Sequence, residues 1–150
     1  MYRIERDQKI HSSIGKAWDF IKTPKNLNRI TPPELDFTIV SDVPSSMFNG
    51  LIVEYIIRIP FLGRRKWIAE IKHIREPFTF VDEQRMGPYK FWYHYHELVK
   101  TEKGIRVIDR VYYEVPYGIL GRLAHFFIIK KILKRIFDYR AAKFAELLSE

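Results

Sequence analysis

Two histidines and two aspartates are the residues of this chain whose types and spacing suggest chemistry. His94 and His96 are one residue apart in an aromatic-rich stretch, and Asp82 and Asp109 lie in neighbouring stretches of the same kind. In an extended strand, residues two positions apart point to the same face of the sheet. Both imidazoles are therefore expected on one face. A buried carboxylate needs a partner, so we expect Asp82 and Asp109 to pair with the histidines.

Such a group of side chains allows three kinds of chemistry. Two imidazoles on one strand face are a common beginning of a metal site, but no third ligand follows at a motif spacing. A histidine oriented by an aspartate can act as a general base, yet the serines, at positions 12, 13, 41, 45, 46 and 149, all lie outside the aromatic stretches. The third alternative is a set of structural hydrogen bonds within a sheet.

A series of strands would position these residues. Alternating apolar residues and turn signals predict seven strands, over residues 2–10, 36–41, 51–59, 65–74, 78–86, 89–101 and 105–115. Ser12 or Ser13 can cap a helix that runs to Ile21, and Asn26 to Ile30 predicts a second short helix. Because short turns join most of the strands, neighbouring strands are expected to be antiparallel.

The chain ends in a proline-free stretch whose apolar residues recur every three or four positions. This spacing predicts a helix from Leu120 to Leu148, about 40 Å long. Its apolar side would consist of Leu123, Phe126, Ile129, Leu133, Ile136 or Phe137, Phe144, and Leu147 or Leu148. Basic residues from Lys130 onward interrupt the apolar run too early for a membrane span, and the apolar side is broader than a coiled-coil seam. A sheet wrapped around the helix would cover this side.

Composition favours one domain, residues 1–150, with a core of its own. The chain has no cysteine, which excludes disulfides and thiolate chemistry, and its start resembles no signal or transit peptide. We therefore expect a cytoplasmic protein. The net charge of +8 favours anionic partners, although many small domains are simply basic. The sequence contains no nucleic-acid-binding motif. Its aromatic residues are also expected to alternate inward, and they do not follow a basic surface.

Several short motifs resemble one known superfamily. They are Phe80-Val81-Asp82-Glu83-Gln84, Gly87-Pro88-Tyr89, Trp92-x-His94-Tyr95-His96, Asp109-Arg110-Val111-x-Tyr113, Pro116-x-Gly118-x-Leu120-Gly121 and Phe137-Asp138-Tyr139-Arg140. Together with the element order, they resemble the SRPBCC (START/Bet v 1-like) superfamily, which includes polyketide cyclases and coenzyme-Q-binding proteins. The similarity is greatest to a bacterial ligand-binding branch without an agreed ligand.

The resemblance implies an α+β helix-grip fold. In this fold a curved seven-stranded antiparallel sheet wraps a long C-terminal helix, two short helices follow the first strand, and an apolar cavity lies between sheet and helix. The resemblance also implies no cofactor and no metal, because the family is not generally metal-dependent. The residues expected to line the cavity are Tyr55, Trp67, Phe80, Asp82, Gln84, Trp92, His94, His96, Asp109, Tyr113, Ala124 and Phe127.

Three functions are compatible with these observations. The first is binding of a small apolar or lipid-like molecule, with Gln84, His94, His96 and Asp109 fixing its orientation. The second is a cyclase or hydrolase that uses a cavity histidine as base. The third is a membrane-associated module with a vestigial cavity. The basic residues that could contact an anionic membrane are Arg64, Arg65, Lys66, Lys130, Lys131, Lys134 and Arg135.

Overall fold

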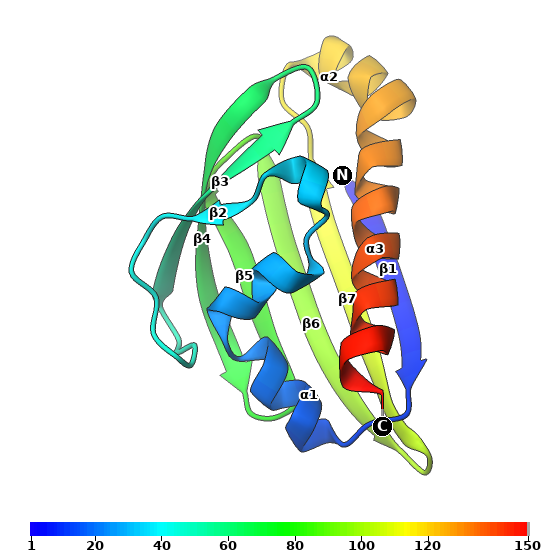
Figure 1. The fold of residues 1–150 in the computed structure, drawn as a ribbon. Coiled ribbons are helices and arrows are strands. Elements are labelled where there is room, and N and C mark those ends of the chain that lie inside the picture. Colours follow the sequence, from blue (N-terminus) through cyan, green and yellow to red (C-terminus); the bar gives the residue numbers. More distant parts are fainter. Residues whose placement is uncertain (150) are drawn as a thin grey trace.

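Seven antiparallel strands form one curved sheet in a computed structural model that describes residues 1–149 (Figure 1). The spatial order of the strands is β1-β7-β6-β5-β4-β3-β2, so the first strand lies beside the last. The strands are β1 (Tyr2–Ile10), β2 (Thr38–Ile39), β3 (Leu51–Ile59), β4 (Gly63–Arg75), β5 (Thr79–Met86), β6 (Phe91–Thr101) and β7 (Gly104–Glu114). The expected helix-grip sheet is confirmed.

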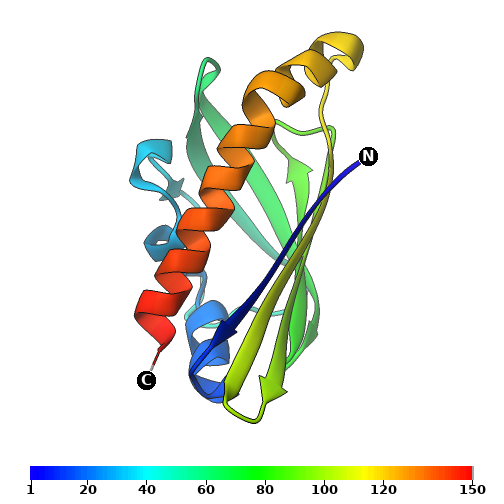
Figure 2. The same cartoon turned by 90° about the vertical axis from the view of Figure 1, so that its right-hand side faces the viewer.

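Helices cover one face of this sheet. Three short helices, α1 (Ile14–Ile21), η1 (Pro24–Ile30) and η2 (Pro33–Leu35), connect β1 to β2. The side chain of Ser13 caps α1 by accepting a hydrogen bond from the backbone N–H of Lys16 at 3.2 Å. After β7 the chain continues as α2 (Gly118–Ala124), η3 (His125–Ile129) and α3 (Lys130–Leu148), and α3 crosses the concave face of the sheet (Figure 2). No helix among the described residues has an apolar stretch long enough to traverse a bilayer.

The second strand is shorter than expected from the sequence. Residues 36–41 were expected to be extended, but only Thr38 and Ile39 pair with β3. Asp36 adopts a left-handed backbone conformation with φ of 44°, which ends η2 and delays the start of the strand. Because β2 is an edge strand, this difference does not affect the strands that carry the histidines and aspartates.

The C-terminal helix contains a π-helical segment that the sequence pattern did not reveal. Leu133, Phe137, Phe144 and Leu148 are buried as expected, whereas Leu123 and Phe126 are 52% and 70% exposed. The π turn in η3 inserts one extra residue and rotates the preceding residues relative to the regular α-helical period. His125 therefore faces inward in place of Leu123 and Phe126.

Candidate ligand cavity and histidine–aspartate cluster

A cavity of about 200 Å³ lies between the sheet and α3, with η1 and η2 along one side. Its wall is mostly aliphatic and aromatic. The sheet contributes Val53, Ile57, Ala69 and Ile71, and the terminal helix contributes Ile129, Ile132, Leu133, Ile136, Phe137 and Phe144. The acidic and basic side chains Asp82, His94, His96 and Arg140 come from β5, β6 and α3, whereas Thr23, Asn26 and Thr31 line the cavity in and beside η1.

Strand register brings the two histidines and two aspartates into one cluster. Asp82 on β5 pairs with His94 on β6, and His96 pairs with Asp109 on β7. His94 Nε2 lies 2.8 Å from Asp109 Oδ1, and His96 Nε2 lies 2.6 Å from Asp82 Oδ2. The other two ring nitrogens complete the cluster: His94 Nδ1 is 3.3 Å from Asp82 Oδ2, and His96 Nδ1 is 3.2 Å from Asp109 Oδ1. Every imidazole nitrogen therefore faces a carboxylate oxygen.

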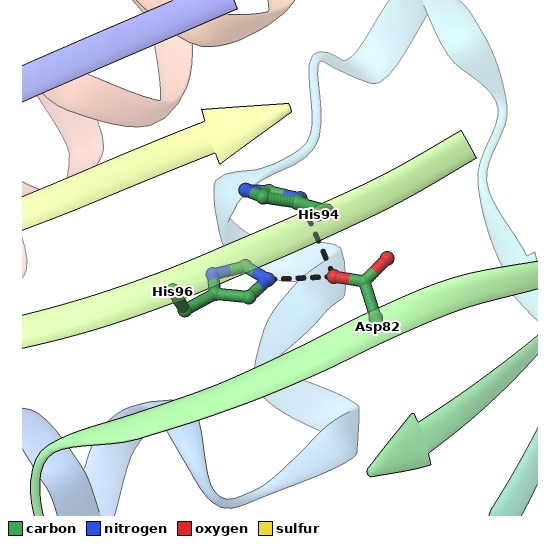
Figure 3. Close-up of side chains that lie close together, drawn as sticks. All are labelled: Asp82, His94 and His96. Atoms are coloured by element: carbon green, nitrogen blue, oxygen red, sulfur yellow. Dashed lines mark hydrogen bonds and ion pairs between the residues drawn. The ribbon is translucent and has the colours of Figure 1, made fainter. Parts of the chain in front are cut away.

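Aromatic packing fixes the two imidazole rings. The rings of His94 and His96 stack with centroids 3.7 Å apart, and Phe80 stacks on the other face of His96 at 4.0 Å. Phe137 from α3 contacts His94 edge-on at 5.5 Å. Figure 3 shows His94 and His96 both directed toward Asp82. The sequence expectation that the histidines face the interior and pair with the aspartates is confirmed.

The environment of the cluster shifts the pKa values of the two histidines in opposite directions. Burial lowers the pKa of His94, and the adjacent His96 lowers it further despite the two carboxylates. Burial acts on His96 in the same direction, but hydrogen bonds to Asp109 and Asp82 outweigh it and raise the His96 pKa. Burial would raise the pKa of Asp109, yet its hydrogen bonds with both histidines hold that pKa well below the usual range. Burial would likewise raise the pKa of Asp82, but the adjacent His94 and the hydrogen bond with His96 lower it, so both carboxylates are anionic at neutral pH.

Seven of the twelve residues expected at the cavity line it. They are Tyr55, Trp67, Phe80, Asp82, Trp92, His94 and His96. All of them come from β3, β4, β5 and β6, where alternation along a strand determines which side chains face α3. Sequence reasoning was therefore most successful in the central strands of the sheet.

Two predicted polar residues, Gln84 on β5 and Asp109 on β7, do not line the cavity. Asp109 lies behind the histidines, which stand between its carboxylate and the cavity. Gln84 follows the last β5–β6 residue pair, and its side-chain amide donates to the carbonyl oxygen of Tyr89 at 2.7 Å. It also accepts from the Tyr89 N–H at 3.3 Å, so Gln84 closes the turn between the two strands.

The other three residues expected at the cavity do not line it, because of how the end of the sheet and the start of the terminal helix are built. The Tyr113 hydroxyl is hydrogen-bonded to His125 Nε2 at 2.8 Å, and Tyr113 is buried outside the cavity wall. Ala124 precedes the π-helical segment and lies away from the cavity. Phe127, within that segment, is 60% exposed because the extra residue turns it outward.

Sequence reasoning missed a half-buried arginine at the cavity. Arg140 lines the wall, and its guanidinium carbon lies 5.3 Å from the centre of the Phe137 ring. Its Nε is buried and has no hydrogen-bond partner among the described residues, and the same holds for the indole Nε1 of Trp67. The spacing offered a signal, because residues three positions apart share a helix face and Phe137 belongs to the predicted apolar side.

Comparisons with known structures agree on the fold. A START superfamily protein from Mycobacterium smegmatis matches with a TM-score of 0.72 at 10% identity, covering 97% of this chain and 96% of that protein. The fold is SRPBCC-like. A protein from Chromobacterium violaceum matches with a TM-score of 0.74 at 10% identity, covering 100% and 99% of the two chains. A protein from Thermus thermophilus matches with a TM-score of 0.69 at 13% identity, covering 97% of this chain and 95% of that protein. No family model and no curated protein matches the sequence. The SRPBCC-like assignment therefore describes the fold alone.

Proposed function

We propose that the protein binds a small amphipathic molecule, an apolar body with an anionic oxygen head, in the cavity between the sheet and α3. The observation that carries the proposal is an apolar wall that contains two buried donors without partners, Arg140 Nε and Trp67 Nε1. Buried donors without acceptors are rare in proteins, so a ligand acceptor is the natural complement. The SRPBCC-like fold is compatible with ligand binding but indicates no particular ligand.

Simple energetics support micromolar affinity for such a ligand. Each buried methylene contributes about 0.8 kcal/mol, and apolar cavities of about 150 Å³ in other proteins do take up apolar molecules. A hydrogen bond to a charged group adds about 1.5–3 kcal/mol. The body of the ligand would thus supply most of the affinity, while Arg140 would select for a carboxylate head.

A medium-chain fatty acid and its methyl ester provide the first test. Both should displace a fluorescent apolar probe, and the acid should bind more tightly. Replacing Arg140 with methionine keeps an apolar side chain but removes the charge. We expect Arg140→Met to weaken acid binding about 10- to 100-fold, measured by probe displacement, and to leave ester binding nearly unchanged.

The matched control is Arg135→Met on the same helix. Arg135 is exposed, and its Nε donates to Glu34 Oε1 at 2.5 Å, away from the cavity wall. Arg135→Met should change neither the affinity for the acid nor the affinity for the ester. If Arg140→Met weakened acid and ester binding equally, Arg140 would support the cavity wall and would not recognise a head group. Absence of saturable probe binding to the native protein would contradict the proposal as a whole.

The geometry supports binding over hydrolase or cyclase chemistry. A general base must offer a free nitrogen to the substrate proton. All four ring nitrogens of His94 and His96 lie within 3.3 Å of a carboxylate oxygen, so none is free in this arrangement. The described serines do not line the cavity either, which leaves no serine hydroxyl there to act as nucleophile.

A second candidate function, docking on an anionic membrane, is favoured by one end of the molecule. The β3–β4 hairpin and α2 lie at the same end in both views (Figures 1 and 2). Large apolar side chains are exposed at this end. We call the surface that they form the apolar end, and it consists of Phe61, Leu62, Ile119, Leu120, Leu123, Phe126 and Phe127. The cavity wall reaches this end through Ile59 and Pro60 of the hairpin and through Ile129. A molecule leaving a bilayer would thus have a short path into the cavity.

Basic residues beside the apolar end complement anionic lipid. Arg65, Lys130 and Lys131, expected from the sequence, lie there together with Arg122. The other four expected residues form ion pairs: Arg64 with Asp36, Lys66 with Glu54, Lys134 with Asp138 and Arg135 with Glu34. Each basic residue near an anionic surface contributes about 1 kcal/mol to binding. Exposed aromatic residues flanked by such charges favour a lipid surface as the occupant of this end.

Vesicle co-sedimentation tests this docking. The protein should bind vesicles that contain phosphatidylglycerol more tightly than pure phosphatidylcholine, and salt should weaken the binding. Replacing Phe126 and Phe127 with alanine should reduce vesicle binding at least about tenfold. Phe78→Ala is the control, because Phe78 is 50% exposed in the turn at the opposite end of β4. No preference for anionic vesicles, or a dimer that the double variant dissociates, would assign the apolar end to a different partner.

A further inference from the structure

The geometry of the two histidines and Asp82 brings three potential ligand atoms together at the wall of the cavity. A neutral imidazole has one N–H and one nitrogen lone pair. Asp109 Oδ1 lies 2.8 Å from His94 Nε2 and 3.2 Å from His96 Nδ1, so one carboxylate oxygen accepts both N–H groups. The other two ring nitrogens, His94 Nδ1 and His96 Nε2, face the same oxygen, Asp82 Oδ2. In the metal-free protein a proton on His96 Nε2 makes the 2.6 Å hydrogen bond to this oxygen, and a divalent ion would displace that proton and take its place between the three ligand atoms.

We propose that Asp82, His94 and His96 bind a divalent first-row transition metal ion, with Asp109 holding both imidazoles in the ligating tautomer. The three ligand atoms lie within 4.8 Å of one another. Two nitrogens and one carboxylate oxygen are a common zinc ligand set, and tetrahedral bonds of about 2.0–2.2 Å place ligand atoms about 3.4 Å apart. The 3.3 Å from His94 Nδ1 to Asp82 Oδ2 already matches this spacing, and the 2.6 Å from His96 Nε2 needs only a small side-chain shift.

Asp109 completes the arrangement expected around such an ion. Histidines that bind metals usually donate their second ring N–H to a carboxylate or carbonyl, which fixes ring orientation and tautomer. Here one buried aspartate serves both rings, and the stacking of Phe80 and His96 limits their rotation. Two carboxylates and one divalent ion are also electrically neutral together, which favours burial of the whole set.

The ion would have an open coordination position. All three ligands line the cavity, so a fourth ligand can approach only from that side. Arg140 lines the same cavity. An ion with three protein ligands and one open position resembles catalytic sites more than structural ones, in which four protein ligands close the coordination.

The sequence argued against a metal because no third ligand followed the histidines at a motif spacing. The third ligand comes from a neighbouring strand, where cross-strand register places Asp82 directly opposite His94. Such a ligand has no fixed sequence separation from the histidine pair, so a motif search cannot find it. The structure therefore removes the spacing argument against a metal, while the expectation drawn from the family resemblance stays a prediction that binding measurements test.

The test uses the full chain without a histidine tag, treated with a chelator and then titrated with Zn²⁺ by calorimetry. We expect one ion per chain with micromolar or tighter affinity. His94→Ala and Asp82→Ala should each weaken binding at least about 100-fold, and Asp109→Asn about 10- to 100-fold. His11→Ala is the matched control, because His11 is exposed and far along the chain from the cluster. This variant should bind Zn²⁺ with the affinity of the native protein.

A spectroscopic measurement on the native protein covers the case in which a ligand variant fails to fold. Co²⁺ in a low-symmetry site with two nitrogens and one carboxylate gives strong visible absorption, whereas hydrated Co²⁺ absorbs weakly. The visible band should saturate at one equivalent and disappear when Zn²⁺ displaces the cobalt. The proposal fails if the native protein binds no Zn²⁺ above the level of Asp82→Ala, or if the cobalt spectrum remains that of the hydrated ion.

Discussion

Replacing Asp109 with alanine is expected to lower the free energy of unfolding by about 3–5 kcal/mol in chelator-treated protein. Asp109 is 5% exposed, and its Oδ1 is the acceptor for His94 Nε2 and His96 Nδ1. Without it, two buried ring nitrogens lose their partner, and a small void remains behind the rings. Urea unfolding at neutral pH, followed by tryptophan fluorescence, measures the loss.

A graded comparison separates the roles of charge and hydrogen bonding. Asp109→Asn keeps one acceptor oxygen for both histidines but removes the negative charge, so its cost should lie well below that of alanine. Asp7→Ala removes another aspartate from the sheet, but Asp7 is exposed and pairs with Arg106 at the surface. Exposed pairs contribute about 0.2–1 kcal/mol, which sets the expected loss. Equal losses for Asp109→Ala and Asp7→Ala would mean that the cluster does not stabilise the fold.

The success of sequence reasoning in the central strands has a simple physical origin. Side-chain direction in a strand has a period of two, and one buried face fixes which set of residues points inward. Once His94 was placed inward, the inward positions of His96 and Trp92 followed. Pairing across β5, β6 and β7 also followed, because short turns join these strands and leave little freedom in register.

The same rule could not say what each inward side chain does. Gln84 has the parity of Asp82 but lies beyond the β5–β6 residue pairs, where the turn uses its amide. Tyr113 has the parity of Asp109 but lies near the sheet end, where its hydroxyl reaches His125. Parity assigns a face of the sheet, whereas the partner of a side chain depends on its distance from the strand end.

The helix shows a different limit of sequence patterns. A regular period of 3.6 residues placed Phe126 and Phe137 on one buried side. A single π turn between them breaks that relation, and local propensity gives no clear signal for such a turn. Arg140 was missed for another reason, since a charged residue on an otherwise apolar helix side is usually assigned to the surface.

Phe137→Ala should be the most destabilising substitution in the terminal helix, at about 3–5 kcal/mol. Phe137 is 2% exposed, lies edge-on to His94 at 5.5 Å and lies beneath the guanidinium of Arg140. Its removal leaves a void where the helix, the cavity and the histidine cluster meet. Because Phe137 supports the His94 ring, the same variant should also weaken Zn²⁺ binding in the calorimetric titration.

Phe126→Ala provides the matched control, with the same residue type in the same helical stretch. Phe126 is 70% exposed on the other side of the π-helical segment, so its loss should change the unfolding free energy by no more than about 0.5 kcal/mol. The two variants therefore test which side of the helix faces the sheet. If both variants lost a similar amount of unfolding free energy, Phe126 would have to be buried, and the helix would have to follow an uninterrupted α-helical period. The observed exposure predicts instead that Phe126→Ala affects vesicle binding, while Phe137→Ala affects stability and the metal site.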